Sequence, residues 1–168
     1  YLSTIRGGKC KIIVPQRGEK RRQLDLAMEN ARLELQEAEV ADQHRGKSLN
    51  LLAEALGLET PPQRMEAFDI SNTAGDQPVA SMTVFQQGKP LKSAYKKFKI
   101  KTVTGGDDYG AMAEVMGRRL DRALSGDASF LPLPDVFLMD GGQGQVRVAK
   151  AELEVRGLNI PIYGMVKD

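Results

Sequence analysis

Two aspartates stand in segments that are otherwise apolar. Asp69 interrupts residues 65–71, and Asp140 ends the run Val-Phe-Leu-Met at residues 136–139. A buried carboxylate is costly unless it is paired or binds a cation. If the two segments are neighbouring parallel strands, their carboxylates lie within about 6 Å and can share one divalent ion. Such an ion neutralises a phosphate and lowers the pKa of an attacking water, so the pair predicts metal-dependent phosphodiester cleavage.

A third acid belongs to the sequence Gly-Gly-Asp-Asp-Tyr, at the start of an expected helix. Asp107 is suited to cap that helix. Asp108 precedes Met112 by four residues and Val115 by seven, so it shares the face that points to the sheet. We therefore assign Asp108 to the chemistry and Asp107 to capping. Glu114 competes for the role, but its spacing places it on the polar flank of the helix.

Each of these residues also has an ordinary structural explanation. Asp140 can be a turn former at a strand end, and Asp107 with Asp108 can be no more than a capping pair. The segment Gly-Gly-Gln-Gly at residues 141–144 resembles a phosphate cradle, but it lacks the spacing of the nucleotide-binding motifs. A mid-strand aspartate such as Asp69 is harder to explain by structure alone.

Basic residues gather in two segments, residues 17–22 and residues 92–101. Lysines of the second segment alternate with Phe98 and Ile100, which suits either phosphate contacts or the protection of an edge strand. The first segment begins a helix and can also be a solvated face. The candidate DNA contacts are Arg17, Lys97, Lys99, Lys101, Arg118, Gln143 and Lys167.

The composition narrows the chemistry further. The 168 residues are 41% hydrophobic and 27% charged, and the net charge is only +2. No apolar run reaches the roughly 20 residues of a membrane helix. A single Cys10 suits a reducing cytoplasm, and with a single His44 it excludes a zinc site of histidines and thiolates. A metal must therefore bind to carboxylates, which favours Mg²⁺ or Mn²⁺.

We expect residues 1–62 to form an extension that packs on the core formed by the remaining residues. Residues 11–14 predict a short strand, and residues 19–44 predict an amphipathic helix with a narrow apolar stripe. We expect Gly46 to break this helix and residues 48–56 to form a second one. The segment Thr-Pro-Pro at residues 60–62 predicts the boundary, with a core at residues 63–168.

The core predicts the order β-β-β-α-β-α-β. The expected strands are 65–71, 79–85, 91–102, 136–140 and 160–166, with a hairpin turn at 86–90. The expected helices are 107–124 and one that follows Gly141 and Gly142 and runs to about Arg156. This order gives an α/β fold, a mixed five-stranded sheet flanked by helices. Ribonuclease-H-like folds have this order of elements. In them the first strand is central and the fourth strand lies beside the first, and we expect this placement by analogy.

The chain closely resembles the C-terminal region of the UvrC family, the nuclease component of the bacterial excision nuclease. The motifs that carry the resemblance run through nearly the whole chain; they are Pro-Gln-Arg-Gly at 15–18, Phe-Asp-Ile-Ser-Asn-Thr at 68–73, Val-Ala-Ser at 79–81, Phe-Lys-Ile-Lys-Thr-Val at 98–103, Gly-Asp-Asp-Tyr at 106–109, Arg-Arg at 118–119, Asp-Gly-Gly-Gln-Gly-Gln at 140–145 and Gly-Met-Val-Lys-Asp at 164–168. Together these motifs are far more specific than any one of them.

The resemblance implies a role in nucleotide excision repair. It implies a ribonuclease-H-like domain that makes the 5′ incision in damaged double-stranded DNA with Mg²⁺ or Mn²⁺, after recruitment by the UvrB–DNA complex. The family's catalytic aspartates fall on Asp69 and Asp140, the metal ligands, and a further acid falls on Asp108.

The chain departs from the family pattern in two ways. The family completes its site with a histidine beyond the last strand, and many relatives carry histidine where this chain has Asn72. A tandem helix-hairpin-helix domain follows in the family. We therefore expect these 168 residues, taken alone, to cut DNA weakly or not at all.

Two other interpretations remain open. One is another ribonuclease-H-like nuclease, related to resolvases or transposases. The other is a catalytically silent domain that docks DNA or a protein. Mn²⁺ binding that depends on the carboxylates separates both nucleases from the silent domain, and a nick on the 5′ side of a lesion separates the two nucleases.

Overall fold

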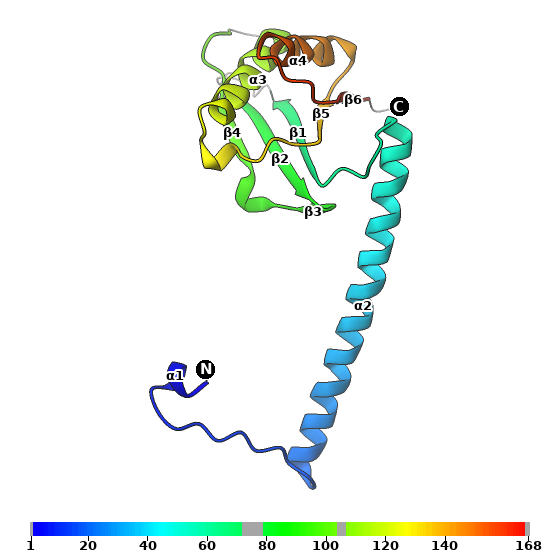
Figure 1. Cartoon of the computed structure of the whole chain (residues 1–168), viewed down its shortest axis with the longest axis vertical. Helices are drawn as coiled ribbons and strands as arrows, with labels where there is room; N and C mark the ends of the chain where they lie inside the picture. The colour runs from blue at the N-terminus through cyan, green and yellow to red at the C-terminus, as the bar shows by residue number, and fades with distance from the viewer. Residues whose placement is uncertain (1, 72–78, 104–106, 167–168) are drawn as a thin grey trace. The chain divides into compact units, whose positions relative to one another are not determined.

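The computed structural model describes residues 2–71, 79–103 and 107–166. The chain forms two compact units, residues 1–47 and residues 48–168 (Figure 1). No helix in the described ranges is long and apolar enough to cross a membrane. The predicted packing of residues 1–62 on the core, and the boundary at residues 60–62, stay predictions.

The first unit contains α1 (Leu2–Arg6) and most of α2 (Glu19–Leu56). The predicted strand at residues 11–14 is wrong, because this exposed segment has no regular secondary structure. A strand needs a neighbour with which to exchange backbone hydrogen bonds. None of the described residues pairs with this segment, and no side chain among residues 4–47 is buried.

Helix α2 is continuous, so the predicted break at Gly46 is also wrong. A glycine inside a helix costs only about 1 kcal/mol relative to alanine, and the good helix formers around it outweigh that cost. The helix ends where the sequence predicts. Gly57 adopts a φ of 64°, and the N–H of Leu58 donates to the carbonyl of Ala53 at 2.8 Å. This pattern is a Schellman C-cap, which favours glycine at the left-handed position.

The second unit is built on a mixed sheet. Its strands are β1 (Arg64–Ser71), β2 (Val79–Gln86), β3 (Lys89–Pro90), β4 (Lys96–Lys99), β5 (Val136–Asp140) and β6 (Ile162–Met165). Their order is β3-β2-β1-β5-β6, with β4 also on β2. β1 runs antiparallel to β2 and parallel to β5. The first strand is thus central and lies beside the fourth predicted strand, as expected for a ribonuclease-H-like fold.

The predicted third strand, residues 91–102, is wrong in its detail. The chain forms the short β3, a 3₁₀ turn η1 (Lys92–Ala94) and then β4. Pro90 has no N–H to donate to a ladder, and a strand at a sheet edge tolerates it. The predicted hairpin turn is present, since Gln87 and Gly88 have φ values of 51° and 70° between the paired Gln86 and Lys89. Two positive φ values suit the right-handed twist of the flanking strands.

One hydrophobic core joins the sheet to the helices α3 (Asp108–Leu124) and α4 (Gln143–Val155) and to the short 3₁₀ helix η2 (Ala128–Phe130) (Figure 1). The predicted apolar face of α3 supplies Met112, Val115, Met116 and Leu120, which are fully buried. The sheet supplies Phe68, among others. Each helix follows a strand in the chain, α3 after β4 and α4 after β5.

Candidate active site

Asp69 and Asp140 occupy equivalent positions on neighbouring parallel strands. The register of β1 and β5 pairs Phe68 with Met139, and the two aspartates follow directly. Side chains alternate along a strand, so both acids extend to the face opposite the buried Phe68 and Met139. Each aspartate is half-buried. The two acids predicted to bind the metal thus stand at the same edge of the sheet.

A row of polar side chains crosses the sheet from Asp69. Ser71 donates from Oγ to Oδ2 of Asp69 at 3.1 Å. Asp69 pairs with Ser81 of β2, and Ser81 pairs with Lys97 of β4. Lys97 and Lys99 are exposed while Phe98 between them is buried, as the alternation predicts. Both lysines therefore share the sheet face of Asp69.

Asp107 and Asp108 take different positions at the start of α3. Asp107 is the N-cap, as predicted, and its Oδ1 accepts from the N–H of Gly110 at 2.9 Å. Asp108 lines a pocket of about 240 Å³ whose other side is formed by the start of α4, including Gly142 and Gln145. The N-termini of two helices converge there. Their partial positive charge favours a bound phosphate or another anion.

The structure does not gather the three predicted catalytic acids into one cluster. Among the described residues, no group of three or more His, Cys, Asp or Glu side chains is placed to hold a metal. Asp108 faces the first turn of α4, two to five residues beyond Asp140, at the same sheet edge. Direct metal binding by Asp69 and Asp140, and support from Asp108, stay predictions.

Gln145 adds an oxygen that the sequence analysis did not single out. Its Oε1 is buried and has no hydrogen-bond partner among the described residues. The amide lies over Gly141, where a Cβ would overlap it, next to Asp140. Mg²⁺ and Mn²⁺ accept carboxylate and amide oxygens. The donor atoms at this edge therefore fit a hard divalent cation.

Glu114 is not on a polar flank, which corrects the sequence interpretation. Its side chain is 8% exposed and accepts hydrogen bonds from Lys101, Thr102 and Arg118, at 2.7 to 3.0 Å. Burial raises the pKa of Glu114, but these hydrogen bonds outweigh it and lower the pKa to about 2. Arg118 also donates to the carbonyl of Lys99 at 2.7 Å. Glu114 thus fixes the segment after β4, and three of the predicted DNA contacts, Lys99, Lys101 and Arg118, take part in that clamp.

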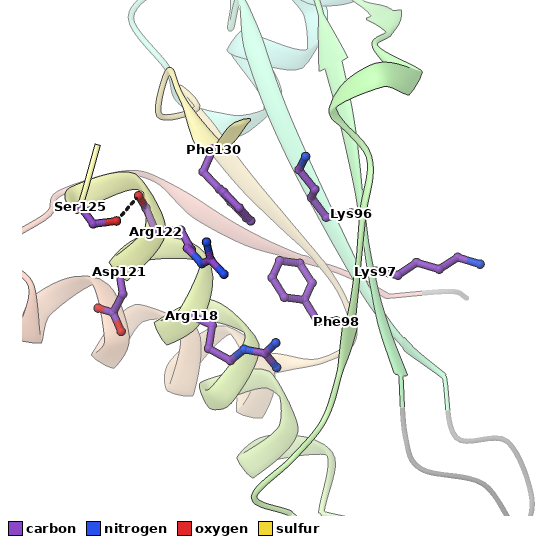
Figure 2. Close-up of a pocket in the computed structure, with 8 residues that line it drawn as sticks. All are labelled: Lys96, Lys97, Phe98, Arg118, Asp121, Arg122, Ser125 and Phe130. Atoms are coloured by element: carbon purple, nitrogen blue, oxygen red, sulfur yellow. Dashed lines mark hydrogen bonds between the residues drawn. The ribbon is translucent and has the colours of Figure 1, made fainter. Parts of the chain in front are cut away.

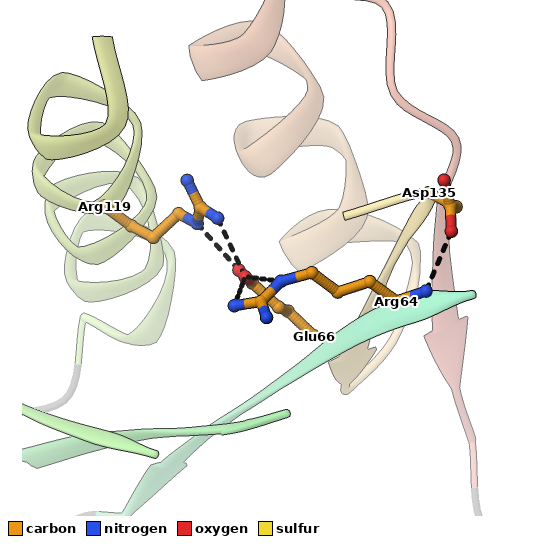
Figure 3. A network of polar contacts seen from close by, with 4 residues as sticks. All are labelled: Arg64, Glu66, Arg119 and Asp135. Carbon is orange, nitrogen blue, oxygen red and sulfur yellow. Dashed lines mark hydrogen bonds and ion pairs between the residues drawn. The ribbon is translucent and has the colours of Figure 1, made fainter. Parts of the chain in front are cut away.

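Among the described residues of this domain, Glu66 is a fully buried acid, which the sequence analysis missed. Arg119 of α3 donates to it at 2.7 and 2.8 Å, and Arg64 donates at 3.0 Å (Figure 3). The backbone N–H of Arg64 is held by Asp135, at 2.8 Å. A signal was present in the sequence, because Glu66 lies two residues before Phe68 and therefore on the core face of β1. This network fixes β1 against α3.

The remaining predicted DNA contacts are scattered. Lys101 and Gln143 are exposed, at the end of the β4 segment and on the first turn of α4. Arg17 is exposed in the first unit, just before α2. Lys167 lies outside the described residues, as does Asn72. The structure therefore brings together Lys97 and Lys99 with Asp69, and leaves Arg17 in a separate unit.

Comparison with known proteins identifies the family. Residues 53–168 match the family model described as the UvrC RNAse H endonuclease domain, and residues 1–38 match the model of the UvrC Ribonuclease H-like domain. The UvrABC system protein C of Clostridium novyi is 42% identical over 184 aligned residues, which cover the whole chain and 30% of that relative. The chain belongs to the UvrC family. The ribonuclease-H-like fold and the resemblance stated from the sequence are confirmed.

Other UvrC relatives give the same result. The UvrABC system protein C of Streptococcus uberis is 48% identical over 94% of this chain and 27% of its own length. The chain thus spans less than a third of these curated relatives. Among solved structures, an endonuclease V of Ciona intestinalis in complex with inosine-containing DNA has a TM-score of 0.46 and 17% identity, over 64% of this chain and 47% of that one. The UvrC endonuclease match begins inside α2 and includes all of the described strands.

Proposed function

We propose that this chain is the nuclease domain that makes the 5′ incision beside damage in double-stranded DNA. The observation that carries the proposal is the register of β1 and β5, which sets Asp69 beside Asp140 in a chain of the UvrC endonuclease family. A carboxylate pair at the carboxyl ends of parallel strands is a suitable place for phosphodiester hydrolysis.

Asp69 and Asp140 would hold Mg²⁺ or Mn²⁺, and Asp108 would support the ion or a water from the start of α3. Such an ion, when bound, neutralises phosphate charge and lowers the pKa of a bound water. The chain's own residues orient the DNA. The N-termini of α3 and α4 attract a phosphate, and Lys97 and Lys99 extend from the same sheet face as Asp69.

In the longer protein, we propose that this domain acts on a UvrB–DNA complex. Its net charge of +2 provides little general affinity for DNA, so recruitment and additional DNA contacts must come from elsewhere. For that reason we expect the 168-residue chain alone to cut DNA much more slowly than the longer protein.

The test uses a full-length UvrC protein that contains this chain, loaded by UvrA and UvrB on a duplex with one lesion. The damaged strand is labelled separately at each end, so that the 5′ and 3′ cuts are read independently. Asp69→Asn and Asp140→Asn are each expected to lower the rate of the 5′ cut by about a thousandfold or more and to leave the 3′ cut unchanged. Glu154→Gln, on the exposed face of α4, removes the same charge and should change neither cut. A normal 5′ cut in either aspartate variant would show that the assignment is wrong.

A further inference from the structure

A second pocket lies beside α3 and the buried Phe98, on the sheet face opposite to the one that carries Asp69. It has a volume of about 470 Å³ and opens between β4, the C-terminal half of α3 and η2 (Figure 2). The residues that line it are Lys96, Lys97, Phe98, Arg118, Asp121, Arg122, Ser125 and Phe130. Apart from Lys97 and Arg118, none of them was a candidate site residue in the sequence.

The pocket is strongly basic. Arg118 and Arg122 reach from α3 toward Phe98, and Lys96 lies beside Phe130, whereas the side chain of Lys97 points away (Figure 2). The acid among the lining residues is Asp121, which accepts from Arg156 at 2.7 Å. That hydrogen bond lowers the pKa of Asp121, so its charge is already compensated by a residue outside the pocket. Three cations therefore face the cavity, and the acids that pair with two of them lie outside its lining: Glu114 contacts Arg118 at 2.9 Å, and Asp127 contacts Arg122 at 3.2 Å.

Aromatic rings position two of these cations, Lys96 and Arg118. The rings of Phe98 and Phe130 lie 6.2 Å apart at the floor. Lys96 Nζ is 5.4 Å from the Phe130 centroid, and Arg118 Cζ is 5.6 Å from the Phe98 centroid. A cation over a ring face is positioned yet keeps its full charge for another ligand.

Arg122 is the most adjustable of the three. Its side chain is 65% exposed, and it pairs with Asp127 at 3.2 Å. An exposed ion pair of this kind contributes at most about 1 kcal/mol, so a stronger anion can displace it. Arginine also offers a planar fork of donors that matches a phosphate.

We propose that this pocket binds a backbone phosphate of the DNA, at a distance from the cut. Helix α3 carries the chain fourteen residues from Asp108 to Arg122, which is about 21 Å at 1.5 Å per residue. At roughly 3.4 Å per nucleotide, a strand that runs along α3 would have about six nucleotides between a phosphate at Asp108 and one at Arg122. That the ligand is DNA rests on the proposed function. The geometry and charge of the basic pocket are independent of that function.

The test measures binding of a fluorescent 30-base-pair duplex to the 168-residue chain by anisotropy, in EDTA and at several salt concentrations. Arg122→Gln and Lys96→Gln are each expected to weaken binding by about threefold or more at low salt and to reduce the salt slope by about 1. Lys150→Gln, an exposed position on α4, is the control and should stay within about twofold of the wild type. Melting curves of all variants should agree within a few degrees.

Equal losses in all three variants, or no loss in the pocket variants, would overturn the proposal. If Lys96→Gln disturbs the packing of Phe130, the exposed Arg122→Glu decides the question alone, with an expected loss of about tenfold or more. A third outcome would also contradict the proposal. In it, inorganic phosphate stabilises the wild type but not Arg122→Gln, while the Arg122 variants bind DNA as the wild type does. EDTA prevents cutting, so this assay measures binding apart from cleavage. A full-length protein that keeps the pocket-dependent binding but makes no 5′ nick when Mg²⁺ is supplied would refute the proposed function and leave the pocket intact.

Discussion

Arg119 donates two hydrogen bonds to Glu66, at 2.7 and 2.8 Å, and neither side chain is exposed to solvent. The pair joins the middle of α3 to the strand that carries Asp69. Arg64 adds a third donor from the same strand, at 3.0 Å. The position of α3 against β1, and with it the position of Asp108 at the helix start, depends on this buried charge.

Glu66→Gln is expected to lower the free energy of unfolding of the second unit by about 3–5 kcal/mol. The substitution leaves Arg64 and Arg119 buried without a compensating carboxylate. Arg119→Met should cost less, because Glu66 keeps its bond to Arg64. Urea unfolding followed by tyrosine fluorescence measures both, since Tyr95, Tyr109 and Tyr163 all lie in this unit. A loss below about 1 kcal/mol for Glu66→Gln would contradict this account of the network.

Glu114 predicts a pH dependence of stability. Its pKa is lowered from 4.5 to about 2, so the ionised carboxylate favours the folded state at neutral pH. This contribution is fully present above pH 4.5 and is lost as the pH falls toward 2. At pH 7 the free energy of unfolding of the wild type should exceed that of Glu114→Gln by roughly 1–3 kcal/mol. The difference is at the lower end of this range if solvent screens the Glu114–Arg118 ion pair. Urea unfolding at pH 7, 4.5, 3 and 2 should show the difference shrinking; a constant difference would argue against the role of the charge.

Gly164→Ala should disturb the carboxylate edge from the neighbouring strand. Gly164 pairs with Met139, and a Cβ there would lie 2.5 Å from the carbonyl oxygen of Gly141. Backbone cannot move away as a flexible side chain does, so we expect a loss of about 1–3 kcal/mol in stability and weaker Mn²⁺ binding. Gly46→Ala, within α2, meets nothing within 4 Å and should not destabilise. Unfolding curves and Mn²⁺ titrations of both variants test this prediction. Wild-type stability and Mn²⁺ affinity in Gly164→Ala would contradict the predicted clash.

Periodicity in the sequence predicts the core strands and helices well, because one face of each is apolar. β1, β2, β5 and α3 lie close to the expected residues. Residues 91–102 are different. Their alternating lysines and apolar residues fit one long strand, but only Lys96–Lys99 finds a partner beyond the turn at η1. Residues 11–14 also have strand character, and the described residues offer them no neighbour.

The candidate site could be predicted where a charged residue stands in an otherwise apolar segment, as at Asp69 and Asp140. Glu66 was missed although its spacing from Phe68 places it on the core face of β1. Its partner Arg119 lies on α3, and no spacing within β1 reveals that pairing. The burial of Glu114 was not predicted, because helical spacing shows on which face of the helix a residue lies but not that the segment after β4 folds over it. The basic pocket combines α3 with residues of β4 and η2, and no spacing within one element reveals such a combination.

The most direct test of the central claim is a calorimetric Mn²⁺ titration of the wild type and of Asp69→Asn, Asp140→Asn and the double variant. If the two aspartates share one cation, each single variant weakens binding by about tenfold or more, and the double variant is little worse than either one. Glu154→Gln should bind as the wild type does. Wild-type affinity in either aspartate variant, or losses that simply add in the double variant, would contradict a shared ion at the edge of β1 and β5.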